Sequence, residues 1–159
     1  MTIDVREARP DDRAKIVDFN ARLALETEAK GLDPAVLERG VARALADPER
    51  LRYWIAESEG RAVGQAAITR EWSDWRDGWL WWLQSVYVIP EARGRGVFRA
   101  LFQEIRRLGR LGPEVIGLRL YVEAGNENAQ RTYRALGLEP AGYHVFEELW
   151  IEPLKGPSD

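Results

Sequence analysis

One stretch of this sequence constrains the fold more than any other, because a strand pattern passes into a helix pattern through a glycine-rich turn. The strand pattern ends at Val88, the turn contains Gly94 and Gly96, and an apolar helical stripe begins just after them. Glycine lets a backbone approach a ligand closely, and the first turn of a helix has N–H groups without intrahelical partners. The helix dipole adds roughly half a positive charge there. We therefore predict an anion site for a phosphate or pyrophosphate.

The spacing of residues in this turn separates it from two common phosphate-binding loops. Residues 84–101 contain neither the GxxxxGK[ST] pattern of nucleoside triphosphate sites nor the GxGxxG pattern of dinucleotide sites. The turn has Arg93 directly before its first glycine. The pyrophosphate of coenzyme A (CoA) fits such a loop better than ATP or NAD.

Two ordered motifs resemble the GNAT superfamily of acyl-CoA-dependent N-acyltransferases. The segment Val88-x-Pro90-x-x-Arg93-Gly94-x-Gly96 resembles its motif A. Residues 126–138 read Asn-Glu-Asn-Ala-Gln-Arg-Thr-Tyr-Arg-Ala-Leu-Gly-Leu and resemble its motif B, Asn-x-x-Ala-x-x-x-Tyr-x-x-x-Gly. The two motifs and their surroundings span about residues 79–146, and the order of predicted elements extends the likeness to nearly the whole chain. The resemblance implies an N-acetyltransferase that moves an acetyl group from acetyl-CoA to an amine of a small molecule or peptide, by direct attack in a ternary complex.

Length and composition predict one domain over residues 1–159, since 159 residues with 45% apolar content can bury a core. With 23 basic and 26 acidic residues, the net charge of −3 argues against nucleic acid or a membrane as a partner. The chain has no cysteine and a single histidine, His144, so we expect no metal. Without a signal-like segment or a long apolar run, we expect a cytoplasmic protein.

Hydrophobic periodicity and turn residues predict an α+β fold in the order β-α-α-β-β-β-α-β-α-β-β. The predicted strands cover residues 2–8, 52–58, 62–70, 79–88, 117–123, 139–143 and 145–151. The predicted helices follow Asp12, extend from Pro34 towards Asp47, and cover residues 94–111 and 126–136. The resemblance implies a mixed, mostly antiparallel sheet of about seven strands flanked by four helices. Residues 152–159 are expected to be a frayed tail.

The resemblance also implies where acetyl-CoA binds, namely where two adjacent parallel strands separate beside a bulge at residues 84–86. Pantetheine would pair with Val86 and Val88, and the pyrophosphate would lie on backbone N–H groups of the loop. The implied cofactor-binding residues are Val86, Tyr87, Val88, Arg93, Gly94, Arg95, Gly96, Val97, Phe98, Arg99, Asn126 and Tyr133. Phe98 replaces the Gly or Ala usual in the family, and we expect its ring to point into the core so that its amide stays free. The alternative is a plain strand-to-helix turn with solvated arginines.

Tyr133 is the implied general acid, because the departing thiolate needs a proton. A phenol with a pKa of about 10 is protonated at neutral pH and can donate one. Its alternative role is packing between helix and sheet. The base is harder to assign, since Gln84 near the bulge cannot accept a proton usefully. Glu28 and Glu71 are the leading candidates, ahead of Glu26, and solvation at the surface is the alternative for each.

Five of the seven tryptophans lie within eleven residues, at positions 72, 75, 79, 81 and 82. Trp72 and Trp75, with Gln84, are candidate acceptor-binding residues, since aromatic faces attract cations. Trp79 and Trp81 are better explained by cross-strand packing or a dimer interface. A homodimer is thus favoured by the aromatic cluster and by the family resemblance.

Two other functions remain open at this level. A non-catalytic acyl-CoA-binding sensor or interaction domain would keep the loop without turnover, and the absence of an obvious base favours it. A nucleotide-binding regulatory domain would bind ATP or NAD instead. The acceptor also stays open among a small amine, an amino acid, an antibiotic and a protein N-terminus.

Overall fold

The computed structural model describes residues 1–29 and 31–151, and its centre is one five-stranded sheet. The strands are β1 (Asp4–Glu7), β2 (Arg52–Ser58), β3 (Arg61–Ser73), β4 (Gly78–Val88) and β5 (Val115–Leu120), and they lie in chain order. Neighbours from β1 to β4 are antiparallel, whereas β5 is parallel to β4. The mixed sheet and the α+β class agree with the sequence prediction.

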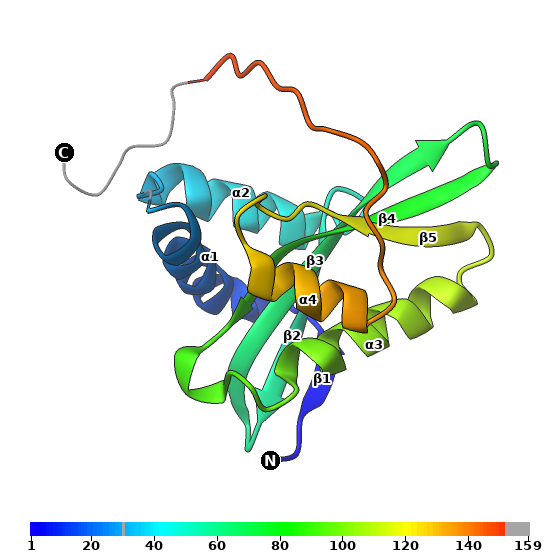
Figure 1. Ribbon diagram of the computed structural model, residues 1–159. Coiled ribbons are helices and arrows are strands. Elements are labelled where there is room, and N and C mark those ends of the chain that lie inside the picture. The colour runs from blue at the N-terminus through cyan, green and yellow to red at the C-terminus, as the bar shows by residue number, and fades with distance from the viewer. Residues whose placement is uncertain (30, 152–159) are drawn as a thin grey trace.

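Helices cover both faces of this sheet (Figure 1). The helices α1 (Arg13–Glu28) and α2 (Pro34–Ala46) lie on one face, and α3 (Val97–Leu111) and α4 (Glu127–Ala135) lie on the other. Two short 3-10 turns, η1 (Pro10–Asp12) and η2 (Pro90–Ala92), precede α1 and the glycine loop. Side-chain caps begin two of the helices: Asp33 accepts from Ala35 and Val36 N–H at α2, and Asn126 accepts from Ala129 N–H at α4.

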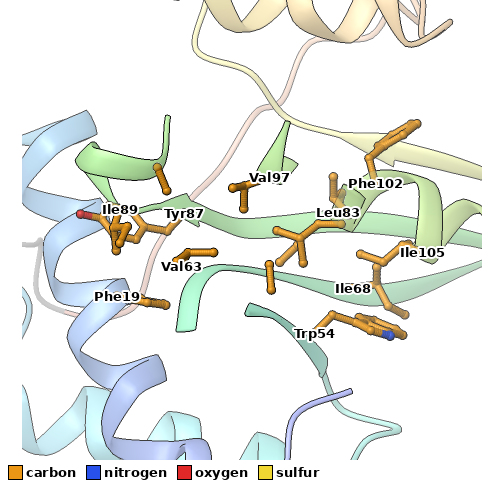
Figure 2. Packing of buried hydrophobic residues seen from close by; sticks show 14 of the residues in the cluster. Phe19, Trp54, Val63, Ile68, Leu83, Tyr87, Ile89, Val97, Phe102 and Ile105 are labelled. Carbon is orange, nitrogen blue, oxygen red and sulfur yellow. The ribbon is translucent and has the colours of Figure 1, made fainter. Parts of the chain in front are cut away.

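The core forms two apolar layers, one on each face of the sheet. The layer beneath α1 and α2 contains Ile16, Val41, Ala44, Tyr53, Ile55 and Ala67. In the other layer the stripe of α3, including Val97, Phe102 and Ile105, packs against sheet residues such as Ile68 and Leu83 (Figure 2). This second layer fixes the start of α3, and hence the glycine loop, against β3 and β4.

The sheet differs from the sequence prediction at its C-terminal end, where the two strands expected at residues 139–143 and 145–151 are not formed. The described part of this segment makes no backbone hydrogen bond to the sheet, and its large side chains are exposed. Residues of high strand propensity, such as Tyr143, Val145 and Phe146, favour a strand, but a strand also has to pair with an edge of the sheet. The tail predicted at residues 152–159 lies outside the described residues. None of the described helices is long and apolar enough to span a membrane.

Candidate active site

β4 separates from β5 halfway along its length. The parallel pairing ends at Leu83 opposite Leu120, while β4 continues to Val88. On its other side β4 carries a bulge, since Gln65 of β3 pairs with Tyr87 and the register has shifted from the pairing of Ala67 with Gln84. The separation and the bulge implied by the resemblance are therefore both present, and no described strand pairs with residues 84–88 on the β5 side of β4.

A buried polar network holds this bulge in place. Ser85 has a left-handed φ of 54°, and its carbonyl oxygen accepts a hydrogen bond of 3.0 Å from Gln65 Nε2. Gln65 is fully buried and also donates to Asn20 Oδ1 at 3.1 Å, while Asn20 Nδ2 donates to the Tyr53 hydroxyl at 3.4 Å. Burial raises the pKa of Tyr53. Sequence reasoning missed this network; a lone glutamine between Val63 and Ile68 was its signal.

The loop that follows β4 has the free donors expected of an anion site. Gly94 and Gly96 have φ values of 75° and 84°, a region that glycine adopts without steric cost. No backbone N–H of residues 94–99 donates a hydrogen bond to any other described residue. These donors surround the positive end of the α3 dipole, so the loop can accept an anion.

Arg93 and Glu26 tie the loop to α1. Arg93 donates through Nε to the Val88 carbonyl oxygen at 2.9 Å and through Nη2 to Glu26 Oε2 at 2.6 Å. The Tyr87 hydroxyl donates to the other oxygen of Glu26 at 3.1 Å, and burial raises the pKa of Tyr87. Glu26 therefore has two partners that position the loop, which argues against its being the base.

Tyr133 reaches the gap from α4. Its ring meets the edge of Phe98 at a centroid distance of 5.8 Å, and burial raises its pKa, so its hydroxyl is protonated at neutral pH. Phe98 also contacts Phe102 at 5.9 Å. The half-buried Phe98 ring thus packs against the edge of the core and against α4, and the Phe98 amide lies in the first turn of α3. Asn126 caps α4 nearby.

These elements enclose a cleft of about 1970 Å³ between α1, α2, the bulge, the end of β5 and α4. Its lining includes Gln84, Ser85, Val86, Asn126 and Tyr133, together with the carboxylates Glu26, Glu28, Asp33 and Glu123. The structure therefore brings Glu28 and Tyr133 to one cleft. Glu123 was missed, although its position at the end of the strand beside the gap was a usable signal. No group of three His, Cys, Asp or Glu in the described part of the chain could hold a metal ion.

Glu71 lies away from this cleft, on the other half of the β3–β4 ribbon. It pairs in register with Leu80 rather than with the bulge, and it is absent from the residues that line the cleft. Its Oε1 accepts from Trp82 Nε1 at 3.0 Å and from Arg119 Nη1 at 2.9 Å. Glu71 therefore forms an ion pair with Arg119 at the surface, outside the cleft.

The tryptophan cluster also lies outside the cleft. Trp72 packs edge-on against its cross-strand partner Trp79 at 4.9 Å, and Trp75 is 84% exposed at the hairpin tip. Trp81 is buried and contacts Trp54 at 6.3 Å. Packing therefore accounts for Trp79 and Trp81, and neither Trp72 nor Trp75 lines the cleft.

Comparison with known proteins agrees with this geometry. Residues 18–138 match the Acetyltransferase (GNAT) family. The crystal structure of "a possible acetyltransferase from Clostridium difficile 630" is 41% identical, with a TM-score of 0.88 over 96% of this chain and 100% of that chain. No protein of curated function matches the sequence.

Two more distant structures share the fold. A predicted acetyltransferase from Clostridium acetobutylicum, solved with acetyl-CoA, is 18% identical, with a TM-score of 0.77 over 92% of this chain and 96% of that one. AAC(6')-Iy, solved with the bisubstrate analog CoA-S-monomethyl-acetylneamine, is 20% identical, with a TM-score of 0.76 over 94% and 99% of the two chains. With a family match over most of its length and a 41% identical relative, the chain belongs to the GNAT family of acetyltransferases.

Proposed function

We propose that this protein is an N-acetyltransferase that transfers the acetyl group of acetyl-CoA to an amine, with both substrates bound together. The observation that carries the proposal is a combination of three features, of which the first lies on the loop that directly follows β4 and the other two share the cleft. These are the free N–H groups after Arg93, the separated strands β4 and β5, and the protonated hydroxyl of Tyr133. Family membership and the two neighbours solved with acetyl-CoA or a CoA analog support acetyl-CoA as the donor.

In this proposal the cofactor runs along β4 from the loop to the bulge. The pyrophosphate accepts hydrogen bonds from the N–H groups of residues 94–99, with Arg95 and Arg99 adding positive charge. Pantetheine pairs with Val86, Tyr87 and Val88 in place of the strand that β5 does not supply beyond Leu120. Asn126 and Tyr133 close the opposite side of the gap.

The transfer forms a C–N bond and breaks the C–S bond of the thioester. The neutral amine attacks the thioester carbonyl carbon, and the Val86 N–H beside the bulge stabilises the oxyanion. As the tetrahedral intermediate collapses, Tyr133 donates its proton to the departing thiolate. The amine proton passes to a base in the cleft.

Glu28 is our candidate for that base, acting through water, because it lines the same cleft as Tyr133. Glu123 is a second carboxylate in the cleft, and it deserves the same test. Glu71 is engaged elsewhere with Arg119 and serves as a matched negative control. The acceptor binds beside Gln84, and its amine is attracted by these acidic side chains. AAC(6')-Iy, an aminoglycoside N-acetyltransferase solved with the bisubstrate analog CoA-S-monomethyl-acetylneamine, shares the fold, which supports including aminoglycosides among the amines tested.

The test is release of free thiol from acetyl-CoA in the presence of a panel of amines. Thiol release that depends on an amine supports the transferase, whereas CoA binding without turnover for any amine would favour the sensor. Stabilisation by ATP or NAD in place of CoA would favour the nucleotide-binding domain. Tyr133→Phe is expected to lower kcat about 10²–10⁴-fold while the Kd for CoA stays within a few fold.

The base is tested by three matched substitutions. Glu28→Gln is expected to lower kcat/KM most below the pKa of the amine, where deprotonation is needed, and Glu71→Gln is expected to leave it unchanged. If Glu123→Gln has the large effect and Glu28→Gln has none, the base is Glu123.

A further inference from the structure

The polar network beneath the bulge ends at the hydroxyl of Tyr53, in the wall of the cleft. Tyr53 is only 4% exposed, yet it lines the cleft from β2. Its register partner on β3 is Ala67, and Ala67 pairs in turn with Gln84 on β4. Residues directly opposite one another on neighbouring strands point to the same face of a sheet. Tyr53 therefore shares a face with Gln84, on the side of the cleft that the proposed acceptor occupies.

The direction of each hydrogen bond in this network follows from one carbonyl group. The Ser85 carbonyl oxygen can only accept, so the amide nitrogen of Gln65 has to face it. The same nitrogen donates to Asn20 Oδ1, which turns the Asn20 nitrogen towards Tyr53. Gln65 Oε1 is buried without a partner among the described residues, because the opposite orientation of this amide would bring two oxygens together. The Tyr53 oxygen is therefore an acceptor in the network.

The Tyr53 hydroxyl keeps a proton that the network does not use. Burial raises the pKa of Tyr53, and the Asn20 and Ser85 side chains oppose this effect only in part, so the phenol is protonated at neutral pH. Neighbours that lower the pKa of a phenol donate to its oxygen rather than take its proton. Within the described part of the chain, no group accepts a hydrogen bond from this O–H. Because a buried donor without an acceptor is costly, the acceptor has to come from a molecule in the cleft.

The charge of the cleft decides which kind of oxygen can accept this proton. The described residues that line the cleft include Glu28, Asp33 and Glu123, and none of them is lysine, arginine or histidine. Such a lining attracts the ammonium form of an amine and repels a carboxylate on the same molecule. The oxygen that Tyr53 contacts is therefore uncharged, as in a hydroxyl group or an amide carbonyl.

We propose that Tyr53 donates a hydrogen bond to an uncharged oxygen of the acceptor, so that the substrate is an amine that also carries a hydroxyl or carbonyl group. The inference rests on the proposed function, since it concerns the acceptor of that reaction. An alkylamine of the same shape would displace water from the Tyr53 hydroxyl without replacing its hydrogen bond. Tyr53 is thus a specificity-determining residue. Its hydrogen bonds continue through Asn20 and Gln65 to the Ser85 carbonyl, so an acceptor held by Tyr53 is positioned relative to the bulge.

The first test compares amines that differ by a hydroxyl in place of a methyl group, namely ethanolamine with propylamine and isopropanolamine with isobutylamine. The wild type is expected to prefer the hydroxylated member by about 5- to 100-fold in kcat/KM, calculated for the neutral amine. Tyr53→Phe removes the donor and should reduce this preference to about twofold or less. Tyr121→Phe is the matched control: Tyr121 also lines the cleft but is 63% exposed, so water can replace its hydroxyl and the preference should stay.

Asn20→Asp tests the direction of the hydrogen bonds without removing the Tyr53 hydroxyl. A carboxylate at position 20 can only accept, so it would take a proton from both Gln65 and Tyr53. Tyr53 would then no longer donate into the cleft, and the preference for the hydroxylated amine should be lost as in Tyr53→Phe. A role of Tyr53 in packing alone would leave the preference unchanged in this variant. Urea unfolding checks that each variant is folded.

Calorimetric titration of the same amines in the presence of CoA separates this inference from the proposed function, because no acetyl group is transferred. A binding preference that depends on Tyr53, found without turnover, would support the hydrogen bond and count against the transferase. A wild type that distinguishes neither pair of amines, in turnover or in binding, would overturn the inference. A preference that survives both Tyr53→Phe and Asn20→Asp would overturn it as well.

Discussion

Replacing Gly96 by alanine tests whether the shape of the anion loop is what binds the cofactor. Gly96 has a φ of 84°, and a Cβ added there would meet no atom within 4 Å. The new methyl group therefore costs nothing by collision, and the whole penalty comes from holding an L-residue in the left-handed region. That penalty is about 1–2 kcal/mol. The substitution thus isolates backbone conformation from packing.

The penalty can be paid in two ways, and both are measurable. If the loop keeps its shape, the free energy of unfolding falls by about 1–2 kcal/mol and CoA affinity is unchanged. If the free loop relaxes to a negative φ, stability is kept and CoA must restore the shape, so Kd rises about 5- to 30-fold. Urea unfolding measures the loss of stability, and calorimetric titration measures the loss of CoA binding free energy. The two losses should add up to about 1–2 kcal/mol.

Gly60 provides the matched control, because it lies in the β2–β3 turn with a φ of 74° and equally open space around its Cα. Gly60→Ala should lose the same stability while CoA binds as to the wild type. If Gly96→Ala changes neither the stability nor the CoA affinity, the left-handed conformation of Gly96 is not needed, and the assignment of this loop as the anion site is wrong. If both variants weaken CoA equally, the effect is general and not a property of the loop.

Three further predictions concern stability. Arg6 binds both oxygens of Asp12 at 2.8 Å and lowers the pKa of that carboxyl, so the pair stabilises the fold above pH 4 and loses this effect as the pH falls further. Asp12→Asn should therefore lower the free energy of unfolding, measured with urea at pH 7, by about 1–3 kcal/mol. The difference from the wild type should shrink below about pH 4, and a difference that does not depend on pH would contradict this role of the pair. Gln65→Leu should lower the free energy of unfolding by about 1–3 kcal/mol, because the Ser85 carbonyl loses its donor, and an unchanged midpoint would show that the network does not hold the bulge. Phe102→Ala should cost about 3–5 kcal/mol at its fully buried site, and a loss below 1 kcal/mol would mean that the layer beneath α3 is loosely packed.

Much of the fold could be predicted because its signals are local. The strand predicted at residues 52–58 was confirmed with the same bounds. Helices were also found where they were predicted from Pro34 and over residues 126–136, and they are capped by Asp33 and Asn126. The two strands predicted after residue 138 were wrong, because no strand forms among the described residues there. Apolar residues in this segment are compatible with a strand, but strand pairing also depends on an edge supplied by a distant part of the chain.

The residues around the cleft were only partly predictable, because several of their contacts join distant parts of the chain. Glu26 was a candidate base, yet it binds Arg93, 67 positions away. Glu71 was placed ahead of Glu26, but the β3–β4 register sets it opposite Leu80, well before the bulge. Nothing near Glu71 in the sequence indicates how far the hairpin extends beyond the cleft.

The sequence by itself determined the order of elements as far as α4 and the glycine turn after Arg93, since periodicity, caps and glycine conformations act over a few neighbouring residues. Only the tertiary structure decided which carboxylates share a cleft with Tyr133, how Gln65 holds the bulge, and that residues 139–151 form no strand of the sheet. Those outcomes depend on register and on packing between segments far apart in the chain, and no local pattern encodes them.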